Sequence, residues 1–126
     1  MRTIITALIV FFGLTATVNA QEMMKKESVK TVTLEQTKGE FTQKGLTLSE
    51  GTYVFEIENT NVGADVGFVL TPKGKLDAEN HIKEAYVTSL VKNNTTGNTN
   101  KVTLKKGEYV YFCPLNKTPQ YTLTVE

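Results

Sequence analysis

The side chains best suited to chemistry in this sequence are few, and one thiol dominates them. The chain has a single cysteine, Cys113, and a single histidine, His81. One cysteine cannot form an internal disulfide, so Cys113 is a buried thiol, a metal ligand or a bridge to a second chain. As a thiolate it would favour a soft metal such as copper. We prefer the plainer interpretation, in which it packs as a small hydrophobic residue at a strand end.

The remaining candidate donors add little. Asp65 could offer a carboxylate oxygen to a metal, but one thiolate and one carboxylate leave the coordination incomplete. Met23 and Met24, with Glu22, could form a weak Cu(I) site, although they fall in a stretch that we expect to be flexible. We expect His81 to face solvent. Because no serine–histidine–acid set and no phosphate-binding glycine loop is present, we predict that the protein is not an enzyme.

The first twenty residues are typical of a cleaved secretory signal. Arg2 is followed by an apolar run over residues 4–14, and short side chains lead to Ala20. The run is too short to span a bilayer, which takes about 20 apolar residues, so we expect no membrane insertion after cleavage. We predict an exported protein, periplasmic or extracellular, with a signal peptide over 1–20, a flexible lead-in over 21–28 and one domain over 29–126.

The charge balance excludes one class of partner. The chain carries 14 basic and 13 acidic residues, and cleavage would remove Arg2 and leave the mature chain formally neutral. Nucleic-acid binding needs a basic surface that neutralises phosphates, so we predict no nucleic-acid partner.

The elements that must position these residues are mainly β-strands. The clearest is 52–59, in which Tyr53, Phe55 and Ile57 alternate with more polar residues. Period-2 alternation and turn signals predict about seven strands, over 29–36, 41–48, 52–59, 66–70, 101–105, 109–113 and 121–125. One short helix is predicted over 78–86, with Asp77 as its N-cap, and 93–100 is predicted to be a loop. This pattern favours an all-β sandwich.

Two stretches resemble the cupredoxins, the small Greek-key sandwiches of plastocyanin and azurin. They are FTQKGLTLSEGTYVFEIEN over 41–59 and GEYVYFCP over 107–114. The likeness extends over 29–126. It implies a cupredoxin-like Greek-key sandwich of about seven strands, in which the penultimate strand ends at a copper-ligating cysteine, here Cys113. It also implies electron transfer by copper and a partner-docking surface at that end of the fold.

The sequence departs from the family at the other copper ligands. A type 1 copper site takes two histidines, a cysteine and a weak axial methionine, whereas this chain has one histidine in all. The resemblance places other residues at the expected ligand positions: Val66 or Asp65 for the first histidine, Asn116, Lys117 or Thr118 for the second, and Tyr121 for the methionine. We therefore expect a degenerate site that retains only Cys113.

Two functions follow from this resemblance. The first is a binding module for an unknown protein partner, with a contact surface that includes Phe68, Pro114, Leu115 and Pro119. The alternative is a copper-binding electron carrier that uses Cys113 with unrecognised ligands, for instance from a second chain. Copper is implied by the resemblance alone. The protein would be a monomer or a Cys113-linked dimer.

Overall fold

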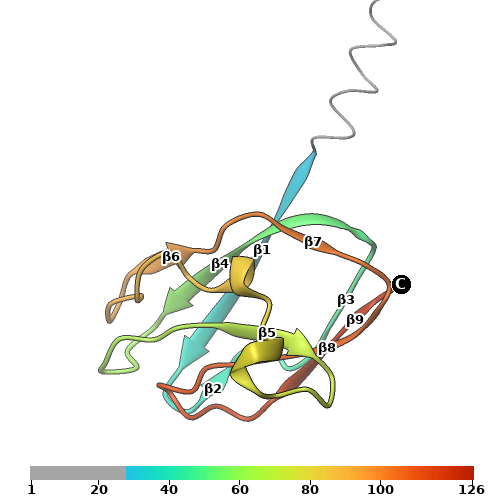
Figure 1. The fold of residues 1–126 in the computed structure, drawn as a ribbon. Coiled ribbons are helices and arrows are strands. Elements are labelled where there is room, and N and C mark those ends of the chain that lie inside the picture. The colour runs from blue at the N-terminus through green and yellow to red at the C-terminus, as the bar shows by residue number, and fades with distance from the viewer. Residues whose placement is uncertain (1–27) are drawn as a thin grey trace, which may run out of the picture.

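The computed structural model describes residues 28–126, which form two β-sheets packed face to face (Figure 1). One sheet has the order β2 (Glu40–Phe41), β1 (Val29–Thr37), β4 (Gly51–Asn59), β6 (Thr96–Asn98), and β7 (Val102–Leu104) also pairs with β4. The other has the order β3 (Leu46–Leu48), β9 (Tyr121–Val125), β8 (Gly107–Phe112), β5 (Val69–Pro72). The all-β prediction is confirmed. The predicted signal peptide, Met23 and Met24 lie outside the described residues.

The parallel pairing of β1 with β4 decides where the candidate site lies. Their register runs from Val29 opposite Thr52 to Gln36 opposite Asn59, so both strands end at the same edge of the sandwich. In the facing sheet, β8 ends at Phe112 and β5 begins at Val69, opposite each other. Gln36, near the end of β1, hydrogen bonds to Gly67 and Asn116 of the segments that contact Cys113, so Cys113 lies at the end of the sandwich where β1 and β4 also finish.

The core comes from the alternation that the sequence predicts. Tyr53, Phe55 and Ile57 of β4 are buried, and the intervening residues are partly exposed. Phe41 packs edge-on against Tyr111 of the facing sheet, with 5.2 Å between ring centroids. Burial of such rings provides most of the favourable free energy of folding.

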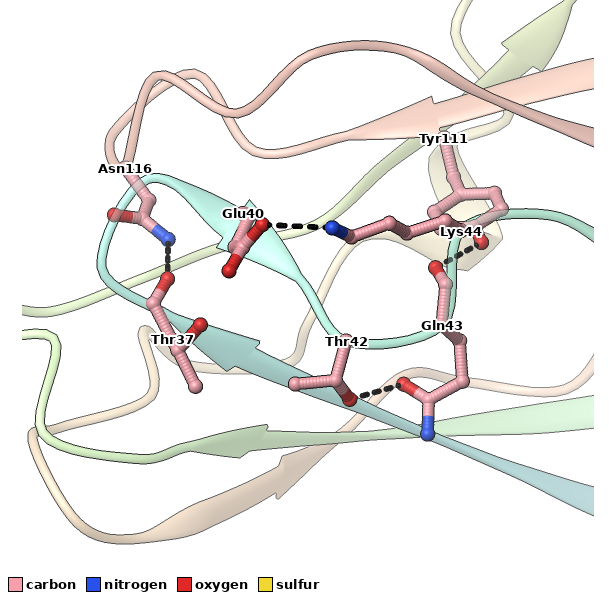
Figure 2. A network of polar contacts seen from close by, with 7 residues as sticks. All are labelled: Thr37, Glu40, Thr42, Gln43, Lys44, Tyr111 and Asn116. Carbon is pink, nitrogen blue, oxygen red and sulfur yellow. Dashed lines mark hydrogen bonds and ion pairs between the residues drawn. The ribbon is translucent and has the colours of Figure 1, made fainter.

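The predicted strand over 41–48 is two strands, one in each sheet. The chain passes from β2 to β3 through Gly45, whose φ of 137° favours glycine. The Tyr111 hydroxyl fixes this crossing, because it donates to the Gln43 carbonyl at 2.6 Å and accepts from the Gly45 N–H at 3.0 Å. Figure 2 shows the first of these bonds.

The strand predicted over 66–70 begins later than expected. β5 starts at Val69, and Val66 instead forms an isolated bridge with Val91. The reason is local, because the Gly67 N–H is directed at the sulfur of Cys113. The segment 93–100, predicted as a loop, contains β6, which pairs with β4 from Glu56 to Glu58.

The predicted helix over 78–86 is wrong. Two single 3₁₀ turns take its place, η2 (Ala78–Asn80) and η3 (Lys83–Ala85), with extended backbone at His81 and Ile82 between them. Asp77 makes no capping hydrogen bond. The sheet explains the break, because the Ile82 N–H donates to the Leu70 carbonyl at 2.9 Å and is lost to any helix. Among residues 28–126, no helix is long and apolar enough to cross a membrane.

Candidate functional site

Cys113 lies directly after β8 and is fully buried, with 0% of its surface exposed. Its sulfur accepts two main-chain hydrogen bonds, from the N–H groups of Gly67 and Asn116, each at 3.3 Å. The preferred interpretation of Cys113 as a buried residue at a strand end agrees with this placement. The two donors come from the segments on either side of the sulfur, so the thiol is enclosed by polypeptide.

Gln36 joins the two segments that donate to this sulfur. Its side chain is fully buried at the end of β1. Its Nε2 donates to the Gly67 carbonyl at 2.8 Å, and its Oε1 accepts from the Asn116 side-chain amide at 3.1 Å. Sequence reasoning missed this residue. The sequence did contain a signal for it, because Gln36 continues the period-2 alternation that places Val32 and Leu34 on the inward face of β1.

Asn116, predicted at a degenerate histidine position, holds the loop after Cys113 to the turn between β1 and β2. Its Nδ2 also donates to the Thr37 carbonyl at 2.8 Å (Figure 2), and its Oδ1 accepts from the Gly39 N–H at 2.8 Å. Both polar atoms of this amide therefore have partners within the protein.

Thr118, the other candidate at that position, closes the same loop. Its hydroxyl accepts from the Cys113 N–H at 2.9 Å, and its own N–H donates to the Cys113 carbonyl at 3.2 Å. Lys117 between these residues is exposed and has a positive φ of 55°. The structure thus brings Asn116 and Thr118 to Cys113, and uses both to shape the loop.

The remaining predicted ligand positions carry no suitable donor at the thiol. Val66 is apolar and fully buried, and Asp65 is exposed. Tyr121 packs in the aromatic cluster, with its ring centroid 5.8 Å from that of Phe41 and 5.5 Å from that of Tyr111. Within residues 28–126, no group of three or more histidine, cysteine, aspartate or glutamate side chains could hold a metal ion.

His81 was predicted to face solvent, but it is half-buried and anchored by both ring nitrogens. Nε2 lies 2.9 Å from the Leu76 carbonyl, and Nδ1 lies 2.8 Å from the Tyr86 hydroxyl. Because a carbonyl can only accept, Nε2 carries a proton. The ring also packs edge-on against Phe112 at 6.2 Å. His81 therefore holds the segment with the two 3₁₀ turns against the outer side of β8.

The predicted partner surface needs one correction. Phe68 is only 2% exposed, because its ring packs in the core against Phe55 at 5.3 Å, so its side chain offers no contact surface. Pro114, Leu115 and Pro119 are exposed. Of these, Pro114 and Leu115 border an open apolar hollow of about 280 Å³, which is lined by Gly67, Phe68, Val69, Tyr86, Val87, Leu90, Pro114 and Leu115. Leu90 and Leu115 are more than half exposed at 53% and 55%.

Tyr111 is expected to make the stability of the fold sensitive to alkali. Burial raises the pKa of its phenol, and the hydrogen bond from the Gly45 N–H offsets part of that rise. Because the pKa of the Tyr111 phenol is higher in the folded state than in the unfolded state, the protonated phenol stabilises the fold. This stability is complete below the ordinary tyrosine pKa of about 10 and is lost as the pH rises through the folded-state value.

The test is urea unfolding of wild type and Tyr111→Phe from neutral pH to about pH 11, a range that spans the ordinary tyrosine pKa. We expect the variant to be less stable at neutral pH and to lose less stability above pH 10, a value set by that same pKa. Tyr109→Phe is the matched control, because it removes a tyrosine hydroxyl whose hydrogen bond lies in an exposed position. An unchanged slope in Tyr111→Phe would contradict the assignment.

Comparison with solved structures identifies the architecture. Auracyanin B matches with a TM-score of 0.62 and 20% identity, over 77% of this chain and 88% of its own. Auracyanin A, described as a "blue" copper protein from the green thermophilic photosynthetic bacterium Chloroflexus aurantiacus, matches with a TM-score of 0.58 and 20% identity, over 79% and 100%. The chain has a cupredoxin fold. An azurin from Methylomonas sp. strain J also shares the cupredoxin fold, with a TM-score of 0.56 and 15% identity over 77% and 98%.

At these identities the likeness defines the cupredoxin fold, and the cupredoxin-like sandwich predicted from the sequence is confirmed. No protein-family model and no curated protein matches the sequence.

The residues around Cys113 do not fit a type 1 copper centre. Such a centre requires two imidazoles beside the thiolate. The chain has one histidine, and its ring is engaged by Leu76 and Tyr86. The amide of Asn116 and the hydroxyl of Thr118 are already hydrogen bonded, and Val66 has no donor atom. Cys113 is the one side chain of the expected ligand set that is present.

Proposed function

We propose that this chain is an exported, non-enzymatic binding module, a cupredoxin-like domain with a degenerate type 1 copper site. One observation carries the proposal: two of the side chains at the expected histidine position, those of Asn116 and Thr118, are already engaged in hydrogen bonds within the protein. Asn116 binds Gln36, Thr37 and Gly39, and Thr118 binds Cys113. The loop is therefore held by protein contacts of the kind that a metal would otherwise supply.

The exposed apolar surface beside Cys113 supports a protein partner. Leu90 and Leu115 border the hollow on its open side, and Pro114 lies next to them. Contiguous apolar surface on a small domain marks interaction sites more often than chance exposure does. We propose that the domain binds through this surface as a monomer, because full burial of Cys113 keeps its sulfur from a partner thiol. A Cys113-linked dimer would require the loop to open first.

A copper titration tests the degenerate site directly. We expect the purified mature protein to stay free of intense visible colour when Cu(II) is added, because a copper–thiolate bond needs supporting ligands that Cys113 lacks. Absorbance and elemental analysis after desalting are the measurements, with Cys113→Ser as the control. An intense, stoichiometric band that the control abolishes would contradict the proposal and favour the electron carrier.

A further inference from the structure

One edge of β5 carries main-chain groups for which residues 28–126 offer no partner. β5 is antiparallel to β8 on its other side, and the Lys73 N–H donates to the Glu108 carbonyl at 3.0 Å. This bond fixes the alternation, so Val69 and Thr71 direct their main-chain groups at β8. Phe68 and Leu70 must then direct theirs away from β8, toward the segment 82–91.

Among the described residues, that edge is closed at two points. Val66 and Val91 exchange two hydrogen bonds of 2.9 Å, and the Leu70 carbonyl accepts from the Ile82 N–H at 2.9 Å. Between them, no hydrogen bond within residues 28–126 engages the N–H or carbonyl of Phe68 or the N–H of Leu70. Both residues are nearly or fully buried. Buried main-chain groups are almost always paired, so the N–H and carbonyl of Phe68, which lines the hollow, call for a partner.

These main-chain groups lack a partner among the described residues because the chain leaves the edge of β5 after Ile82. It turns through η3, and then Val87 bridges Thr99 while the Thr88 N–H donates to the Asn98 carbonyl at 2.9 Å, on the other sheet. The hollow described above opens between this departing segment and the edge of β5. Gly67 contributes to its depth, because a Cβ there would meet only Leu90, at 3.8 Å.

We propose that this edge and hollow bind a short extended segment of a partner protein, which pairs with Phe68 and places one large apolar side chain in the hollow. The inference rests on the proposed binding function and names the class of partner. Phe68 lines the hollow and offers one main-chain donor and one acceptor at the strand edge, a pair that complements the main chain of an extended polypeptide. In this pairing, one partner residue lies opposite Phe68, and its two neighbours in the partner chain direct their side chains to the opposite face of the sheet. That is the face of Val69, on which the hollow lies.

The dimensions favour a short protein segment over a small molecule. The hollow of about 280 Å³ is slightly smaller than small-molecule sites, which occupy roughly 300–1,000 Å³. The open edge lies between Val66 and Leu70, a span of about 13 Å at about 3.3 Å per residue. About three residues can therefore pair before the partner chain turns outward.

The test uses the full mature protein labelled with ¹⁵N and a capped pentapeptide with leucine at its centre and threonine elsewhere. We expect saturable shifts of the Phe68 and Leu70 amide signals, and slower hydrogen exchange at Phe68, whose N–H the peptide would engage. The matched peptide is N-methylated at the two residues that flank leucine, which removes the main-chain donors and keeps the side chain. We expect it to bind about tenfold more weakly.

Variants of the protein test whether the peptide binds in the hollow or binds non-specifically to exposed apolar residues. Leu90→Ser and Leu115→Ser should each weaken binding about tenfold, because each removes apolar contact with the inserted side chain. Leu76→Ser is the matched control, since Leu76 is 41% exposed and lies outside the lining of the hollow. It should bind as wild type does. All three leucines are well exposed, so the variants should fold.

Three results would overturn the inference. They are no saturable shift at millimolar peptide, equal binding of the N-methylated peptide, and a self-associated protein that shows the same shifts without peptide. The last would assign the edge to a second copy. These results are independent of the copper titration, so a protein that stays colourless and ignores the peptide would retain the proposed function and lose this inference.

Discussion

Replacing Gln36 by leucine is expected to lower the free energy of unfolding by about 2–4 kcal/mol, which makes it one of the most damaging single changes at the candidate site. Leucine keeps the size of the side chain and removes both of its hydrogen bonds. The Gly67 carbonyl would lose its partner in a buried contact, and one Asn116 amide hydrogen would lose its partner in a partly buried one. Each buried group left unpaired costs about 1–3 kcal/mol.

Thermal or urea unfolding measures this loss, and we expect Tm to fall by at least about 10 °C for a domain of this size. The matched control is Gln120→Leu, the same substitution at an exposed position, which should change stability by less than about 0.5 kcal/mol. Equal, small effects at the two positions would refute the structural importance of Gln36.

The same substitution should expose the thiol. Cys113 is buried, so a thiol reagent can reach it only when the loop opens. Gln36 ties the two segments that donate to its sulfur, so its loss should favour that opening. If local opening becomes easier by about 2 kcal/mol, labelling in native conditions should accelerate about 30-fold. Labelling that is fast already in wild type would contradict the buried placement.

Gln36 also gives this fold a physical rationale without a metal. It connects Gly67 to Asn116, and the family resemblance places the expected copper-ligand positions at or beside these two residues. A metal would tie the same segments together by coordination, whereas here one buried carboxamide does so by hydrogen bonds. Buried polar groups that are fully paired specify one arrangement of a core, so the loop can be rigid with Cys113 as a passive member.

The sequence predicts the parts of this structure that depend on neighbouring residues. The alternation of Tyr53, Phe55 and Ile57 suffices to define β4, and the stretch before Cys113 suffices to place the thiol at a strand end. The site beyond Cys113 was harder. The alternation along β1 places Gln36 among the inward-facing residues, but its partners Gly67 and Asn116 lie 31 and 80 residues away along the chain. No local pattern encodes such contacts.

The errors have the same origin. Helical spacing over 78–86 was a local signal, and it yielded to one tertiary hydrogen bond from Ile82 to the edge of β5. Phe68 lies in the predicted strand over 66–70 and was predicted to belong to the partner surface, yet its ring packs in the aromatic core against Phe55. Leu90 was not predicted as a surface residue of interest, because its neighbours in the hollow come from three separate segments.

Replacing Gly97 by alanine is the second change with a large expected effect. Gly97 lies in β6, and a Cβ there would stand 2.7 Å from Cγ2 of Val91, closer than real contacts allow. Val91 is 2% exposed and belongs to the core. Its β-branched side chain has few rotamers available, so it cannot swing aside, and the sheet must shift instead. We expect a loss of about 1–3 kcal/mol, the usual cost of overpacking.

Two comparisons make this prediction specific. Gly51→Ala is the matched control, because Gly51 also lies in a strand and its added Cβ would meet Tyr53 at an ordinary 3.7 Å. We expect it to be neutral or slightly stabilising, since alanine restricts the unfolded chain. In the double variant Gly97→Ala with Val91→Ala, the steric conflict disappears, so the combined loss should be smaller than the sum of the single losses. Strict additivity, measured by urea unfolding, would show that Val91 is not what excludes a side chain at position 97.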